Sequence, residues 1–322
     1  MFTQNEELLP ELDRLLKAIS QTCPAGAVSA GKMLAVLCRP WLQHIRSGRP
    51  FHTSLLTPGG YPLEFAFGPD SSEISYTVEP GAPQSSVVDK WRFVHEIAHG
   101  VGQIHPHPHP LLPELVAQTS QRFGCWLSVR HRGDIPSLKV YQEVTPQAGE
   151  SVLRHLKCEV PDLEVVTELR PMLLGVGSAA SGLVEYYCKI NAPNPGVLHK
   201  LFAAAGAARH LPCVIDHLAY LAAEQSSKLW DRLDVGMSYS VSSTTRPTVT
   251  LFADASQLFP TDRKARTRML GLARQTNVQM PVYDRITSQF EKVVPREMVH
   301  GLVALKVSES GMIRCGVGLQ PF

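Results

Sequence analysis

One carboxylate lies in an otherwise apolar segment near the beginning of the chain. The segment Leu63-Glu64-Phe65-Ala66-Phe67 follows the turn-forming sequence Thr57-Pro58-Gly59-Gly60. Apolar residues after Pro and Gly predict a β-strand that is entered through a turn. A carboxylate among apolar neighbours must be paired, exposed to a wet cavity, or raised in pKa, because burial disfavours its charged form. Each of these states can serve chemistry, so Glu64 is a candidate catalytic residue, and we expect it to face the inside of a barrel.

A second pattern with chemical potential is built from histidines. Residues 95–105 satisfy H-E-x-x-H-x-x-G-x-x-H, the pattern of metzincin-like zinc hydrolases. On a helix His95 and His99 can bind one zinc ion, with His105 as the third ligand and Glu96 as the general base. The segment 87–104 also carries the apolar stripe of an ordinary packing helix. A zinc hydrolase is therefore kept as an alternative hypothesis.

Composition and charge exclude several other classes of protein. The 322 residues carry a net charge of +2 and only 19% charged side chains, so charge does not indicate binding to nucleic acid or to a membrane surface. Seven cysteines without paired spacing fit reduced thiols rather than a disulfide framework. The first residues are acidic and lack the apolar region of a signal peptide. We expect a cytoplasmic protein that forms a single domain over residues 1–322.

The order of predicted elements repeats along the chain. Hydrophobic periodicity predicts helices over residues 6–19 and 27–45 and then strands over 52–68 and 73–80. The same order of two helices and two strands returns four times. The later helices are expected over 87–104, 111–123, 148–158, 161–170, 195–204, 214–233, 262–275 and 282–293. The later strands are expected over 125–130, 138–141, 173–177, 182–187, 237–241, 248–252, 302–307 and 312–317.

Five such units predict an α+β fold built around a barrel. Each hairpin is antiparallel, and ten strands can close on one another so that no sheet edge remains. A barrel of this size is wider than its own side chains can fill, so a solvent-filled lumen is expected. The helices would then form a ring around the outside of the barrel.

With this order of elements, the sequence resembles the ABBA-type aromatic prenyltransferases, in particular the dimethylallyltryptophan synthase-like branch. The segment Thr57–Glu64 resembles the "T-x-D-G-x-P-(I/L)-E" stretch of that branch, and Glu79-Pro80 also fits. Lys139-Val140-Tyr141 matches the K-x-Y motif on the fourth strand. The resemblance implies a secondary-metabolism enzyme that joins a dimethylallyl or geranyl group from its diphosphate to an electron-rich aromatic acceptor such as an indole.

The resemblance also implies roles for individual residues. The carboxylate of Glu64 would bind the acceptor N–H or O–H and offset the positive charge that grows on the ring during alkylation. Cationic side chains would hold the diphosphate; the candidates are Lys139, Arg314, Arg130 and Lys306. Aromatic side chains would shield the allylic cation and line the substrate pocket; the candidates are Tyr141, Tyr186, Phe252, Tyr239 and Trp126.

The sequence departs from the family pattern at the diphosphate site. Ser75, Gly182 and Val184 stand where basic residues are usual in the family. A diphosphate needs several cations or a metal ion in a chamber of low dielectric constant. Three hypotheses stay open: Mg²⁺ assists near Glu185 or Asp254, the phosphate site is remodelled, or the barrel binds or cyclises a small molecule without using a diphosphate. In the favoured hypothesis no cofactor is required.

Overall fold

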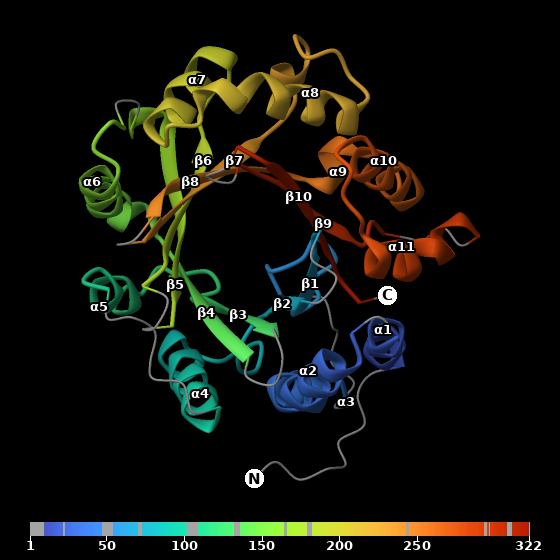
Figure 1. Ribbon diagram of the computed structural model, residues 1–322. Coiled ribbons are helices and arrows are strands. Elements are labelled where there is room, and N and C mark those ends of the chain that lie inside the picture. Colours follow the sequence, from blue (N-terminus) through green and yellow to red (C-terminus); the bar gives the residue numbers. More distant parts are fainter. Residues whose placement is uncertain are drawn as a thin grey trace.

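The structure, a computed structural model, describes residues 10–21, 23–46, 54–69, 73–101, 109–131, 136–163, 166–178, 182–242, 245–292, 295, 297–307 and 311–321. In this part of the chain ten strands form one closed antiparallel barrel, in the order β1-β10-β9-β8-β7-β6-β5-β4-β3-β2 (Figure 1). They are β1 (Leu63–Phe67), β2 (Ile74–Val78), β3 (Cys125–His131), β4 (Pro136–Glu143), β5 (Leu169–Gly177), β6 (Val184–Ile190), β7 (Val235–Ser242), β8 (Thr245–Asp254), β9 (His300–Val307) and β10 (Ile313–Leu319). The predicted ten-stranded antiparallel barrel is confirmed.

Helices surround this barrel on its outer side, as predicted (Figure 1). The α-helices are α1 (Pro10–Ser20), α2 (Pro24–Leu37), α3 (Arg39–Arg46), α4 (Val87–Gly100), α5 (Leu112–Val116), α6 (Gly149–Glu159), α7 (Pro195–Ala204), α8 (Leu211–Ala222), α9 (Ala255–Leu258), α10 (Asp262–Gln275) and α11 (Pro281–Thr287). Short 3₁₀ helices are η1 (Pro146–Ala148), η2 (Val166–Glu168), η3 (Ala208–His210), η4 (Leu229–Asp231) and η5 (Ser288–Glu291). Among the described residues, no helix is long and apolar enough to cross a membrane.

Two predicted helices are wrong for most of their length. The predicted helix 161–170 is replaced by η2 and by the beginning of β5 at Leu169, which pairs with Ile190 of β6. A short apolar run fits a buried strand as well as a helix, so its periodicity did not separate the two. Of the predicted helix 111–123, only α5 (Leu112–Val116) is helical. The amides of Arg122, Phe123 and Gly124 donate to the Glu143 carboxylate instead of to a helical carbonyl.

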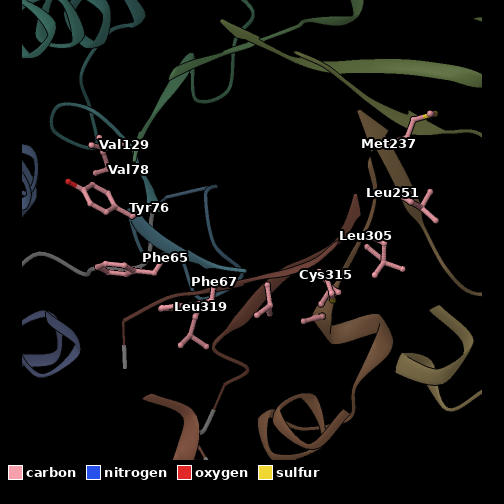
Figure 2. Close-up of a cluster of buried hydrophobic side chains, with 14 of the residues drawn as sticks. Phe65, Phe67, Tyr76, Val78, Val129, Met237, Leu251, Leu305, Cys315 and Leu319 are labelled. Atoms are coloured by element: carbon pink, nitrogen blue, oxygen red, sulfur yellow. The ribbon is translucent and has the colours of Figure 1, made fainter. Parts of the chain in front are cut away.

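Alternate residues of each strand point outward and form the hydrophobic core with the helices. Figure 2 shows Phe65, Tyr76 and Leu305 projecting from the outer face of the barrel, and each is at most 1% exposed. The core therefore lies between barrel and helices, as a ring around the sheet. Because side chains alternate along a strand, this arrangement fixes which residues are left to face the lumen.

The inward-facing residues are mostly polar, small or aromatic. They include Glu64, Ser75, Thr77, Trp126, Ser128, Arg130, Lys139, Tyr141, Glu185, Tyr187, Ser238, Ser240, Thr250, Phe252, Lys306 and Arg314. Most of them keep partial contact with solvent, whereas their outward-facing neighbours are buried. Solvent therefore enters the barrel, and side chains in the lumen are free to meet a ligand.

A buried ion pair ties α4 to the end of β2. Lys90 and Glu79 are 3% and 4% exposed, and the Lys90 Nζ lies 2.5 Å from a Glu79 carboxylate oxygen. Lys90 also donates to the Phe123 carbonyl at 2.8 Å, and the other Glu79 oxygen accepts from the Ser54 hydroxyl at 2.5 Å. The Trp41 indole N–H donates to the Glu79 carbonyl at 3.0 Å. This network joins α3, α4 and the segments that enter β1 and β3.

We expect Lys90→Met to lower the free energy of unfolding by about 3–5 kcal/mol, because Glu79 is then a buried charge without its partner. The double variant Lys90→Met/Glu79→Gln should recover most of that loss, as measured by urea denaturation. The matched control is Arg92→Met on the same helix, where the pair with Asp89 is exposed and is worth about 0–1 kcal/mol. Equal effects at Lys90 and Arg92 would contradict this description of the network.

Candidate active site

Glu64 lies at the beginning of β1 and faces the lumen. Its register partner on β2 is Thr77, and the Leu302 backbone N–H donates a hydrogen bond to its carboxylate. Burial raises the pKa of Glu64 to about 8; the Leu302 hydrogen bond opposes this shift and the nearby charge of Asp254 adds to it. Glu64 is half-buried, and no cation is among the groups that shift its pKa. Its carboxyl group can therefore change protonation state near neutral pH.

Two glycines leave the space that the Glu64 carboxylate occupies. A Cβ atom at Gly301 of β9 or at Gly318 of β10 would overlap Glu64 Oε1. Any other residue at either position would push the carboxylate out of this place. The predictions from sequence missed both glycines, because only the pairing of β1 with β10 and of β10 with β9 brings them to Glu64.

Four aromatic side chains line the lumen beyond Glu64. The rings of Tyr141 and Tyr187 meet edge to face, with centroids 5.4 Å apart, and Tyr187 lies 6.0 Å from Phe252. Trp126 stacks on Phe123 at 4.1 Å, and its buried indole N–H has no hydrogen-bond partner in the described structure. We call Trp126, Tyr141, Tyr187 and Phe252 the aromatic belt. Its π-faces can stabilise a cation, and its apolar surfaces can exclude water from one.

Cations gather on the other side of the aromatic belt, towards the hairpin turns. Lys306 and Arg314 are direct cross-strand neighbours on β9 and β10. Burial lowers the pKa of Lys306; Glu185 opposes this shift, and the charges of Lys139, Arg130 and Arg314 add to it. The four predicted diphosphate ligands are therefore close enough to interact. Cations held together against their mutual repulsion form a natural place for an anion.

One acidic residue lies within this group of cations. Glu185 of β6 is 7% exposed and lies with one carboxylate oxygen 2.5 Å from the Lys139 Nζ. Tyr187 donates to the same oxygen at 2.6 Å, and Ser240 donates to the other at 2.9 Å. Burial acts to raise the pKa of Glu185, but the Lys139 charge and the hydrogen bonds outweigh it and lower the pKa to about 2. Glu185 is therefore ionised at neutral pH.

The register of β6 corrects two of the predicted substrate-binding residues. Tyr186 points outward, is 1% exposed, and lies 3.3 Å from the His109 ring nitrogen. Tyr239 also points outward and donates its hydroxyl to the Leu201 carbonyl at 2.7 Å. Neither residue can line the lumen. The inward tyrosine of the third unit is Tyr187, and the inward residue two positions before it is Glu185 rather than Val184.

This correction has a simple cause in the sequence. Because Tyr186 and Tyr187 are adjacent, the sequence does not show which of the two faces inward. A shift of one residue in the register would exchange the two faces of the strand. The apolar Cys188 and Ile190 share a face with Tyr186, and both are buried against the helices. Their alternation was the signal that could have placed Tyr187 inward.

The other predicted residues lie in the lumen, as their roles require, although this placement does not test the roles themselves. Trp126, Tyr141 and Phe252 belong to the aromatic belt, and Glu64 lies at the end of the barrel where β3 begins and β8 ends. Lys139, Lys306, Arg314 and Arg130 lie towards the opposite end. The lumen thus has an acidic end and a cationic end, separated by aromatic rings.

The histidine pattern lies outside this lumen. His95 and His99 both belong to α4, where the His95 ring lies 5.6 Å from the ring of Trp91 and His99 is exposed. Glu96 is exposed as well, and His105 lies outside the described residues. Among the described residues, no group of three or more His, Cys, Asp or Glu side chains is arranged to hold a metal ion. Nothing in the described structure supports the zinc hydrolase.

Comparison with known proteins agrees with the barrel. No family model and no curated protein matches the chain. Among solved structures, 6-dimethylallyltryptophan synthase from Micromonospora olivasterospora, in complex with DMASPP and Trp, is 16% identical over 97% of this chain and 96% of its own, with a TM-score of 0.78. The 5-dimethylallyltryptophan synthase from Streptomyces coelicolor is 17% identical over 97% and 95%, with a TM-score of 0.73.

A third similar structure is the prenyltransferase PriB in its ternary complex with L-tryptophan and dimethylallyl thiolodiphosphate. It is 18% identical over 98% of this chain and 96% of its own, with a TM-score of 0.72. Likeness over nearly the whole of both chains covers all five units and the closure of the barrel. The chain therefore has the fold of the ABBA-type aromatic prenyltransferases.

Proposed function

We propose that this protein is an aromatic prenyltransferase, which moves a dimethylallyl or geranyl group from its diphosphate to an electron-rich aromatic acceptor such as an indole or a tryptophan derivative. The observation that carries the proposal is the order of groups along one lumen: a carboxylate of raised pKa, then the aromatic belt, then a group of cations. Similar solved structures bear the names of dimethylallyltryptophan synthases and of the prenyltransferase PriB, and three of them contain both tryptophan and DMASPP or dimethylallyl thiolodiphosphate.

The proposed reaction is an electrophilic alkylation. The allylic C–O bond breaks and its electron pair leaves with the diphosphate. A ring carbon of the acceptor attacks the allylic cation to form the new C–C bond, and the ring then loses a proton from that carbon. Lys306 and Arg314 would hold the departing diphosphate, next to Lys139 and Arg130, which are paired with Glu185 and Glu73. The aromatic belt would keep water away from the cation.

Glu64 would act on the acceptor at the other end of the lumen. Its carboxylate would accept a hydrogen bond from the ring N–H or O–H and offset the positive charge that the ring gains during attack. Such an interaction is stronger in a site from which water is excluded than in bulk solvent. The backbone N–H of Leu302 holds the carboxylate by a hydrogen bond, and the two facing glycines leave the space that it occupies.

We further propose that the protein works in the cytoplasm as a single domain and without a metal ion. All seven cysteines are free thiols, which fits a reducing compartment. Glu185, one of the two acidic residues proposed for Mg²⁺, already accepts hydrogen bonds from Lys139, Tyr187 and Ser240. Asp254 lies at the opposite end of the lumen from the cations, beside the register position of Leu302.

We expect purified protein to prenylate an indole acceptor when it is supplied with dimethylallyl or geranyl diphosphate, as detected by mass spectrometry. Glu64→Gln should lower kcat by about 100-fold or more, because the charge that offsets the ring cation is removed. The control Glu150→Gln changes an exposed residue of α6 and should leave turnover unchanged. Full activity in Glu64→Gln, with unchanged circular dichroism, would remove Glu64 from the mechanism.

The charge of Glu64 also predicts a pH dependence. Its raised pKa of about 8 keeps the carboxyl group protonated below that pH in the free enzyme, and the proposed role needs the ionised form. The value of kcat/KM for the acceptor should therefore rise with pH and level off above about 8. The Glu64→Gln variant should lack this rise. The same rise in both proteins would show that another group is responsible.

Removal of metal ions gives an independent prediction. Because every step proposed above uses side chains of the protein, incubation with EDTA should leave turnover within about twofold of the untreated enzyme. Turnover that EDTA abolishes and that added Mg²⁺ restores would contradict the metal-free proposal while it leaves prenyl transfer itself intact.

A further inference from the structure

The Glu185–Lys139 pair has a consequence for the anion that this lumen accepts. Glu185 receives hydrogen bonds from Lys139, Tyr187 and Ser240, so each carboxylate oxygen is already used. The two side chains lie on β6 and β4, on either side of β5, where Glu185 is paired with Gly175 and Lys139 with Gly177. Tyr141 packs beneath Lys139, whose Nζ lies 4.6 Å from the ring centroid. The pair is thus a built part of the lumen wall rather than a chance surface contact.

Glycine between the two strands explains how the pair can form. A Cβ atom at Gly175 would lie 3.3 Å from the Glu185 Cβ and 3.3 Å from the Tyr141 ring, tighter than ordinary packing. Because the register partners on β5 are both glycines, Gly175 and Gly177, no side chain of β5 stands between Lys139 and Glu185. The contact is therefore permitted by the sequence of a third strand.

The same pairing repeats at the mouth of the lumen. Arg130 lies with its Nε 2.7 Å from a Glu73 oxygen, although its own side chain is 49% exposed. In the described part of the chain, Lys306 and Arg314 form no ion pair. Of these four lumenal cations, two are held in ion pairs with acids of this chain and two are not, although the Glu185 charge also acts on Lys306. Two free positive charges match the charge of a single phosphate group better than that of a diphosphate.

We propose that Glu185 is a built-in counter-anion that occupies Lys139 and thereby tunes this lumen towards an anion of lower charge than a diphosphate, in the range of a single phosphate. The inference rests on the proposed use of the lumen for a phosphorylated prenyl donor. A phosphate that is to reach Lys139 must displace the Glu185 carboxylate and its hydrogen bonds. The affinity of the lumen for a diphosphate is weakened accordingly. Glu185 therefore determines how strongly the lumen discriminates between a diphosphate and a single phosphate group.

The test measures binding of inorganic pyrophosphate and inorganic phosphate by calorimetry at low salt. Wild-type protein should bind the two with affinities within about threefold of each other, since both use Lys306 and Arg314. Glu185→Gln should tighten pyrophosphate binding by about tenfold or more, because Lys139 gains a free charge to donate. The double variant Lys139→Met/Glu185→Gln should return to within about threefold of wild type, because it lacks both charges of the pair.

A matched control separates this effect from a general change in charge. Glu73→Gln removes the same charge at the mouth of the lumen, where Arg130 is exposed and screened, and should tighten pyrophosphate binding by less than about threefold. Thermal melting establishes that each variant is folded. If Glu185→Gln fails to fold, the comparison of the double variant with wild type and the wild-type preference between the anions still decide the question.

Two results would overturn the inference. One is unchanged or weaker pyrophosphate binding in folded Glu185→Gln. The other is a strong loss of pyrophosphate binding in the double variant, which would show that Lys139 already serves the anion in the wild-type protein. Neither result depends on turnover. Failure of prenyl transfer with intact anion binding would instead contradict the proposed function and leave the role of Glu185 standing.

Discussion

The structure depends on one constraint: in a closed ring of strands, every second side chain must face inward. Closure gives every strand a hydrogen-bonded neighbour on both sides, so the barrel is held together by its backbone pairing. The outward residues provide stability, because they are buried under the ring of helices. The inward residues are thereby released from packing and can be polar, charged or half-exposed. Chemistry and stability are divided between the two faces of the same ten strands.

This division also explains the polarity of the lumen. Each strand carries only a few inward positions, and the antiparallel order sets their height in the barrel. Glu64 at the beginning of β1 and Phe252 near the end of β8 therefore lie towards one end, whereas Lys306 and Arg314 lie towards the hairpin turns. An acidic end for the acceptor and a cationic end for the phosphate follow from strand direction alone. The aromatic belt lies where the two reactants would meet.

Much of this arrangement could be predicted from the sequence, and the failures are local. The fivefold order of elements predicted the barrel, and a lone carboxylate in an apolar strand predicted Glu64 on the inner face. Tyr186 was placed on the wrong face because the adjacent Tyr187 leaves the register of the strand open by one residue. Tyr239 was placed on the wrong face although it alternates with serines and shares its face with the apolar Met237 and Val241, a pattern that indicates an outward position. Gly301 and Gly318 could not be found, since only non-local strand pairing brings them to Glu64. Glu185 was noticed only as a possible Mg²⁺ neighbour, and its pairing with Lys139 depends on Gly175 and Gly177 of the strand between them.

The most direct test of the central claim is a crystal structure of the protein with dimethylallyl thiolodiphosphate and tryptophan. We predict phosphate oxygens on Lys306 and Arg314, the allyl group among the rings of the aromatic belt, and the indole N–H on the carboxylate of Glu64. Phosphates bound at the Glu64 end, or a donor bound outside the barrel, would contradict this prediction.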